Sequence, residues 1–149
     1  MTKDDLGSML VGSWELISRI DRTKTGEQRI EPSLGSDPIA FLVFDRAGHF
    51  AAQFMRRERN NITDSGAPSA ATNNSRARGG YDAYFGTYAV DADDRTVKTR
   101  LVGALSPENV GQVFTRMMRV DRDSLTIELE TATAAGEGVR RTLRWTRVA

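Results

Sequence analysis

Hydrophobic and polar residues alternate with a period of two through most of the chain, which is typical of strands that bury one face. Residues 125–133 show the pattern most clearly, with apolar side chains at every second position from Leu125 to Leu129. Segments of this kind, bounded by turn residues, span residues 13–21, 39–44, 49–55, 83–90, 96–105, 112–120, 125–133 and 139–148. The pattern therefore predicts eight strands. In the first of these strands, alternation places Trp14, Leu16, Ser18 and Ile20 on one face and Glu15, Ile17 and Arg19 on the other.

Three segments depart from this pattern. Residues 3–10 are predicted to form a short helix, because Asp4 and Asp5 are favourable near a helix N-terminus. Residues 106–111 are predicted to be a turn or a single helical turn. Residues 56–80 are rich in Gly, Asn and Ser and carry five arginines against two acidic residues. Such a long irregular segment inside a domain is typical of a disordered loop or a functional lid.

Eight strands joined mostly by short turns, without a long helix, favour an antiparallel up-and-down meander. A meander of this length removes its exposed edges by closing into a barrel. Eight strands leave an interior just wide enough for side chains or one small ligand. We therefore expect one all-β domain over residues 1–149, an eight-stranded barrel with a short N-terminal helix. The alternative is a two-sheet sandwich, whose long crossover only residues 56–80 could supply.

Composition narrows the function classes. The chain has 149 residues, 39% apolar and 28% charged, which fits one domain with one core. Its formal net charge is +1, so the chain lacks the basic excess of a nucleic-acid binder. No segment is long and apolar enough to span a membrane. There is no cysteine, which excludes disulfides and thiolate chemistry, and the first residues lack the apolar run of a secretion signal. We expect a cytoplasmic protein without a cofactor, a metal, a nucleic-acid partner or a membrane partner.

The head of the first strand carries Gly12-Ser-Trp14. This resembles the Gly-x-Trp of lipocalins, in which the tryptophan closes the base of the barrel. In lipocalins an arginine of the last strand packs over that indole, an arrangement that cation–π attraction favours. The candidates in this chain are Arg141, Arg144 and Arg147.

A longer set of residues resembles the lipocalin-like domain family of small bacterial and fungal proteins over about residues 10–130. The matching features are the Asp45–His49 hairpin, Tyr84-Phe-Gly-Thr-Tyr-Ala-Val-Asp91, Thr96-Val97, Gly111, Arg116 and Asp123-Ser-Leu-Thr-Ile127. The resemblance implies a lipocalin-shaped barrel and, from members found beside natural-product pathways, binding or shaping of a hydrophobic intermediate. Family members often have histidines where this chain has Thr99 and Arg100, so a proton-transfer role at those positions does not carry over.

Arg116 is the first candidate for a binding residue. It shares the more apolar face of its strand with Phe114, Met118 and Val120. A charge that points into a barrel needs a partner. That partner is either a ligand carboxylate held bidentately or an internal carboxylate such as Glu15. A third possibility is that Arg116 faces water on the opposite phase of the strand.

Other candidates come from neighbouring strands. Tyr84 and Tyr88 share a face with Gly86, which would leave room for a ligand. His49 is the single histidine; it is either a general base facing the interior or a solvated residue at a turn, and alone it makes no histidine-rich zinc site. Gln53 and Thr99 are expected to add polar contacts. The apolar lining is expected to come mostly from Phe41, Phe44, Phe50, Phe54, Met55, Phe85, Phe114, Met117 and Met118.

Three functions fit these residues. The first is binding of a small hydrophobic or amphipathic molecule, with an anionic or carbonyl end near Arg116. The second is a cyclase, isomerase or hydrolase in which Arg116 and a tyrosine polarise a carbonyl, with His49 or a tyrosine transferring the proton. The third is a structural or protein-partner module that acts through residues 56–80. A homodimer is compatible with the sequence but is not indicated by it.

Overall fold

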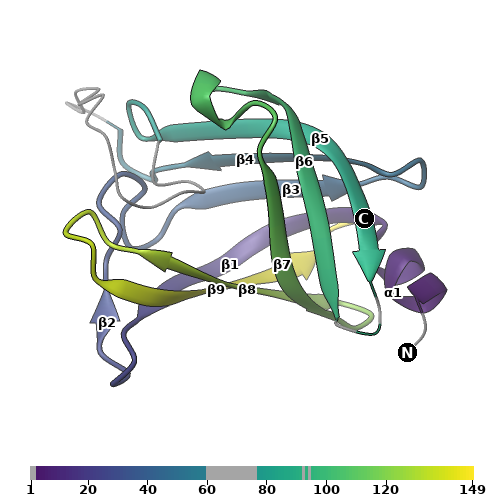
Figure 1. Cartoon of the computed structure of the whole chain (residues 1–149), viewed down its shortest axis with the longest axis horizontal. Helices are drawn as coiled ribbons and strands as arrows, with labels where there is room; N and C mark the ends of the chain where they lie inside the picture. Colours follow the sequence, from purple (N-terminus) through teal and green to yellow (C-terminus); the bar gives the residue numbers. More distant parts are fainter. Residues whose placement is uncertain (1–2, 60–76, 92, 94) are drawn as a thin grey trace.

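The structure, a computed structural model of the chain, describes residues 3–59, 77–91, 93 and 95–149. One short helix precedes the strands, and a single 3-10 turn lies between the sixth and seventh of them (Figure 1). The elements are α1 (Lys3–Leu10), β1 (Gly12–Arg22), β2 (Gln28–Arg29), β3 (Ile39–Phe44), β4 (His49–Met55), β5 (Tyr81–Asp91), β6 (Thr96–Ala104), η1 (Pro107–Asn109), β7 (Val113–Val120), β8 (Ser124–Ala132) and β9 (Gly138–Arg147).

The strands form a closed antiparallel barrel. Neighbours in the sheet follow chain order from β3 to β9, and β1 pairs with both β3 and β9. The barrel therefore has eight strands, and the two-residue β2 only extends the end of β1, where Asp21 lies opposite Arg29. The prediction of an eight-stranded up-and-down barrel with a short N-terminal helix is confirmed, and the sandwich is excluded. Each of the eight predicted strands corresponds to one strand of the barrel.

The helix closes one end of the barrel. Leu6 and Leu10 of α1 are buried, and the indole Nε1 of Trp14 donates to the carbonyl oxygen of Leu10 at 3.0 Å. Arg147 is the arginine of the last strand that covers this indole, with its Cζ 4.2 Å from the ring centroid. Its guanidinium also donates to the carbonyl oxygens of Met9 and Val11, which fastens the end of α1 to β9. In Figure 1 this base lies on the right, beside both chain termini.

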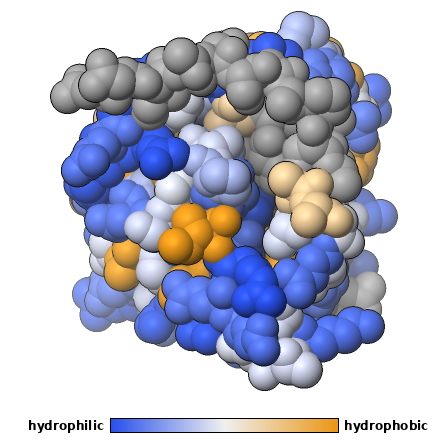
Figure 2. All heavy atoms as spheres, turned by 90° about the vertical axis from the view of Figure 1, so that its left-hand side faces the viewer, coloured by the Kyte–Doolittle hydropathy of each residue, from blue (hydrophilic) through white to orange (hydrophobic). Residues whose placement is uncertain are grey.

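The opposite end carries the connection between β1 and β3, the end of β4, the start of β5, and the β8–β9 hairpin (Figure 1). The predicted irregular segment of residues 56–80 begins and finishes here, although residues 60–76 lie outside the described part of the chain. Its two described ends meet, because Arg56 N donates to Gly80 O and Arg59 Nε donates to Gly79 O. Figure 2 looks onto this end, where hydrophilic residues surround a small apolar area.

A bulge in β1 corrects the predicted faces of the first strand. The register of β1 against β9 shifts between Leu16 and Ser18. Alternation holds up to that point, with Trp14 buried inside and Glu15 exposed. Beyond it Arg19 and Asp21 take the inner positions and are buried. One extra residue in a strand reverses every side chain that follows it, so two charged residues enter the barrel.

A second irregularity explains Gly86. The β5–β6 register shifts between Phe85 and Gly86, and the two backbones approach closely there. A Cβ atom at residue 86 would stand 1.8 Å from the carbonyl oxygen of Arg100. The glycine is therefore required by the contact between β5 and β6. The hypothesis that it leaves room for a ligand is wrong.

No helix of the described residues is long and apolar enough to cross a membrane.

Candidate ligand cavity

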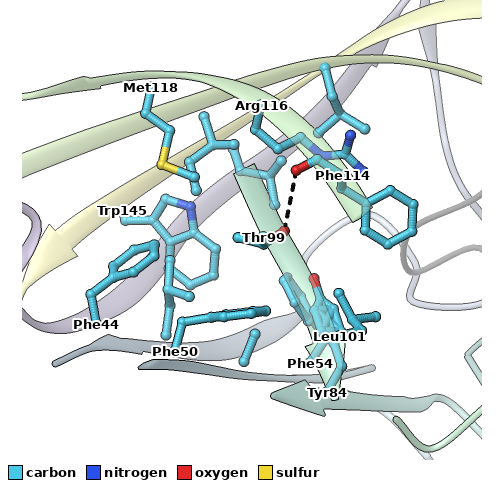
Figure 3. A pocket seen from close by; sticks show the side chains of 15 residues that line it. Phe44, Phe50, Phe54, Tyr84, Thr99, Leu101, Phe114, Arg116, Met118 and Trp145 are labelled. Atoms are coloured by element: carbon cyan, nitrogen blue, oxygen red, sulfur yellow. Dashed lines mark hydrogen bonds between the residues drawn. The ribbon is translucent and has the colours of Figure 1, made fainter. Parts of the chain in front are cut away.

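A cavity lies inside the barrel, on the inner side of the base that the helix closes. Its wall is largely apolar and is contributed by β3 to β9 (Figure 3). Its volume, counted as the space open to the centre of a water molecule, is about 50 Å³. This is room for roughly three to five water molecules. The lining residues are Leu42, Phe44, Phe50, Ala52, Phe54, Tyr84, Thr99, Leu101, Phe114, Arg116, Met118, Ile127, Leu129, Leu143 and Trp145. Side chains thus fill most of the interior and leave a small hollow.

Arg116 brings a positive charge to this wall from β7. Its guanidinium stacks on the ring of Phe114, with Cζ 4.6 Å from the centroid, and Nη1 donates to the carbonyl oxygen of Thr115 at 3.3 Å. Nη2 is buried and has no hydrogen-bond partner. Burial lowers the pKa of Arg116 to about 10, with Arg141 lowering it further and Tyr84 opposing the shift, so the group remains a cation at neutral pH. The suggested internal partner, Glu15, is exposed on the outside of β1, and that hypothesis is wrong.

Thr99 and Tyr84 lie beside Arg116 in the cavity wall (Figure 3). Thr99 is buried on β6, and its hydroxyl donates to the carbonyl oxygen of Phe114 at 3.5 Å, a long bond. Burial raises the pKa of the Tyr84 phenol, and the charge of Asp82 adds to the rise, so this hydroxyl is neutral at physiological pH. Both groups can orient a polar ligand atom.

Trp145 contributes a further polar atom that sequence reasoning did not single out. The indole lies on β9, is 1% exposed, and meets the ring of Phe54 edge-on at 5.8 Å. Its Nε1 is buried without a hydrogen-bond partner and belongs to a residue of the cavity wall. The tryptophan at the head of β1 differs in this respect, because its Nε1 is bonded to Leu10.

Charged groups also gather inside the barrel toward the end opposite the helix. Arg141 and Asp21 form a buried bidentate ion pair, with Nε–Oδ1 at 2.8 Å and Nη2–Oδ2 at 3.0 Å. Arg19 reaches Glu31 at 3.5 Å. Burial lowers the pKa of Arg19 to about 10. Period-two alternation in β1 did not predict these buried charges, because the sequence carries no signal for the bulge that turns Arg19 and Asp21 inward.

Asp82 is the ionisable group of this region with the pKa nearest neutrality. It is 1% exposed; Oδ1 accepts the backbone N–H of Ala83 at 3.0 Å, and Oδ2 has no hydrogen-bond partner. Burial raises the pKa of Asp82 to about 6, although the Ala83 hydrogen bond and the charge of Arg19 oppose the rise. Sequence reasoning did not find this residue, although it lies two positions before Tyr84 and therefore on the same face of β5.

Three candidates lie outside the cavity. His49 is exposed at the start of β4, where its Nδ1 is 3.4 Å from the carboxylate of Asp45. Gln53 is exposed on the outer face of the same strand. Tyr88 packs its ring edge-on against Phe44 at 4.9 Å and donates its hydroxyl to the carbonyl oxygen of Asp45 at 2.6 Å. The expectation that His49 and Gln53 line the interior is wrong, and the solvated alternative for His49 fits its position. Tyr88 shares the inner face of β5 with Tyr84 and packs against the core, but it does not line the cavity.

The apolar candidates divide by strand face. Phe44, Phe50, Phe54, Phe114 and Met118 line the cavity. Met55 is half-buried at the end of β4. Phe41, Phe85 and Met117 are exposed on the outer surface, so the expectation that they line the interior is wrong. Among the described residues no group of three or more His, Cys, Asp or Glu is arranged to hold a metal ion.

Comparison with known proteins agrees with this architecture. The family model described as a lipocalin-like domain matches residues 11–148, nearly the whole chain. The chain belongs to the lipocalin-like domain family. The matched span runs from β1 to the end of β9, so it includes the Trp14–Arg147 contact at the base and every residue of the cavity wall. The comparison with curated proteins gave no match.

Proposed function

We propose that this lipocalin-like protein binds a small amphipathic molecule in the barrel cavity and holds its anionic or carbonyl end with Arg116. The observation that carries the proposal is the half-buried Arg116 at the cavity wall, whose Nη2 is buried and has no hydrogen-bond partner. A buried donor without an acceptor is costly, and a buried cation without a counter-charge is costlier. A ligand carboxylate would supply both the acceptor and the negative charge.

The rest of the wall defines the remainder of the ligand. Aromatic rings of Phe50, Phe54 and Trp145 and the aliphatic side chains of Leu101 and Leu143 favour an apolar body. The volume of three to five water molecules fits a short carboxylic acid of a few carbons. A larger ligand would require side chains of the wall to move.

The test is calorimetric titration with short aliphatic carboxylates and benzoate. Replacing Arg116 by methionine should weaken binding by about 10- to 100-fold, because a hydrogen bond to a charged group is lost. The fold should survive, since the substitution removes a half-buried charge that has no ion-pair partner and keeps an unbranched side chain in the cavity wall.

Arg119→Met is the matched control, because Arg119 lies on the same strand but faces solvent beside Glu128. Binding that Arg116→Met leaves unchanged, or that both substitutions weaken equally, would refute the proposal.

An acid–base enzyme is the second candidate, and Asp82 is the observation that favours it. The groups first considered for proton transfer are unsuited, since His49 points outward and the pKa of Tyr84 is raised. Asp82, inside the barrel with a pKa of about 6, is matched to proton transfer near neutral pH. The partner-module hypothesis depends on residues 56–80, most of which lie outside the described part of the chain. The cytoplasmic location stays a prediction.

A further inference from the structure

We infer that the carbonyl end of the ligand lies in a side opening of the barrel between β7 and β8, and that the ligand is a short acyl chain joined through its carbonyl carbon to a larger polar head group. The inference rests on the proposed function and specifies its class of ligand. The β7–β8 ladder ends at Met117 and Glu128. Beyond these two residues no backbone pairing links the described residues 113–116 of β7 with residues 129–132 of β8, and Figure 1 shows the two strands diverging.

Inward-facing side chains of β7 are accessible where this ladder is missing. Met118 and Val120, on the paired part of the strand, are buried. Phe114 and Arg116 belong to the same inner face and line the cavity, yet both are only half-buried. The side opening is therefore covered by these two side chains and not by a backbone ladder.

Arg116 extends its guanidinium along the edge of the side opening. Met118 N donates to Arg95 O, so the backbone groups of Met118 point toward β6. Because these directions alternate along a strand, the carbonyl oxygen of Thr115 points the other way, toward the missing part of the β8 ladder. Nη1 of Arg116 donates to this oxygen at 3.3 Å. The guanidinium thus lies where the next strand would otherwise pair.

The apolar part of the cavity extends away from the side opening. In Figure 3 Arg116 and Phe114 lie on one side of the cavity, and Phe44 and Trp145 lie on the opposite side. A carbonyl or carboxylate oxygen that accepts from Nη2 of Arg116 is therefore held at the side opening, with its hydrocarbon chain directed inward.

Charged side chains fill the end of the barrel opposite the helix. Arg141 is hydrogen-bonded to Asp21 there, and Arg19 reaches Glu31 of the β1–β3 connection. Each of these four side chains is at most 10% exposed. A ligand that passed between them would have to break buried ion pairs, which is strongly unfavourable. The two side chains that cover the side opening need only rotate.

The position of the side opening decides which end of the ligand can be enlarged. The cavity limits the hydrocarbon chain to a few carbons, whereas a group attached to the carbonyl carbon reaches solvent. An acyl amide or ester still offers its carbonyl oxygen to Arg116. A polar group at the far end of the chain would be buried among hydrocarbon side chains without a partner.

Two isomeric amides test this polarity by isothermal titration calorimetry. N-Butanoylglycine carries its amide at the head of the butanoyl chain, whereas 4-acetamidobutanoate has the same atoms and charge with the amide toward the tail. We expect N-butanoylglycine to bind within about threefold of butanoate. Its isomer should bind at least about tenfold more weakly, because its amide would be buried without a partner.

A nitroxide on the head group locates it. The probe is the butanoyl amide of 4-amino-TEMPO, and its reduced, diamagnetic form is the control. In ¹⁵N–¹H spectra the probe should broaden the backbone signals of residues 113–116 and 129–132 more strongly than those of residues 31–35. The latter belong to the β1–β3 connection, at the end of the barrel that the charged side chains fill.

The outcomes separate this inference from the proposed function. If butanoate binds but neither amide does, or if both amides bind equally, the side opening does not hold the head group and the proposed function stands. Broadening that is strongest at residues 31–35, or absent altogether, contradicts the inference in the same way. If neither butanoate nor N-butanoylglycine binds the wild-type protein, the proposed function fails and this inference with it.

Discussion

Replacing Arg141 by methionine should lower the free energy of unfolding by about 3–5 kcal/mol, because it leaves the carboxylate of Asp21 buried without its partner. The two residues lie directly opposite each other in the β1–β9 ladder. Arg141 is 0% exposed and Asp21 4%, and the guanidinium holds both carboxylate oxygens. Chemical denaturation of the wild type and the variant measures the loss.

Arg140→Met is the matched control for this prediction. Arg140 precedes Arg141 on β9 but faces solvent, where it pairs with Glu128 and Glu130. Exposed ion pairs are screened by water, so this substitution should change stability little. A double variant, Arg141→Met with Asp21→Leu, should recover much of the loss, because it removes both charges. Equal losses for Arg140→Met and Arg141→Met would show that the buried pair has no special role.

The second large effect is an increase in the free energy of unfolding. Asp82→Asn should stabilise the protein above pH 6, by up to about 3 kcal/mol, because asparagine cannot acquire the charge whose burial is unfavourable. The pKa of Asp82 is raised from 3.8 to about 6 in the folded protein. A raised carboxyl pKa means that Asp82 favours folding most below its unfolded pKa and loses that contribution as pH rises through about 6. The advantage of the variant should therefore be small near pH 4 and complete by pH 8.

Unfolding experiments from pH 4 to pH 8 on both proteins give this difference directly. Other carboxylates also titrate in this range, but they do so in both proteins, so the difference isolates residue 82. Asp91→Asn, at the exposed end of the same strand, is the control and should not reproduce the gain. An advantage for Asp82→Asn that is independent of pH would mean that Asp82 is ionised without cost in the fold.

Much of the barrel was predictable because each strand has its own period-two pattern and its own turn. The contact between Trp14 and an arginine of the last strand was also anticipated, since Gly-x-Trp at the head of a barrel is a local signal. Strict alternation in β4 would have placed His49 and Gln53 outside, opposite to Phe50 and Phe54, as the structure has them. Thr99 follows the same rule and faces inward with Val97 and Leu101.

Other features depend on contacts between distant segments. The bulge in β1 that admits Arg19 and Asp21 arises from its pairing with β9, more than 100 residues away in the chain. Gly86 appeared to make space for a ligand, whereas it is required by the backbone of Arg100. The size of the cavity and the unpartnered donors of Arg116 and Trp145 result from how all the inner side chains pack together, which no single strand encodes.

Native mass spectrometry with a cavity-filling variant tests the central claim, that binding takes place inside the barrel, most directly. Ala52 is 3% exposed and lines the cavity, whereas its neighbour Ala51 points to solvent, so Ala52→Leu fills the hollow and Ala51→Leu is its control. After incubation with short carboxylic acids, the wild type and Ala51→Leu should carry a bound mass that disappears on denaturation, and Ala52→Leu should carry none. Equal occupancy of all three folded proteins, or no bound mass on any of them, would contradict the account.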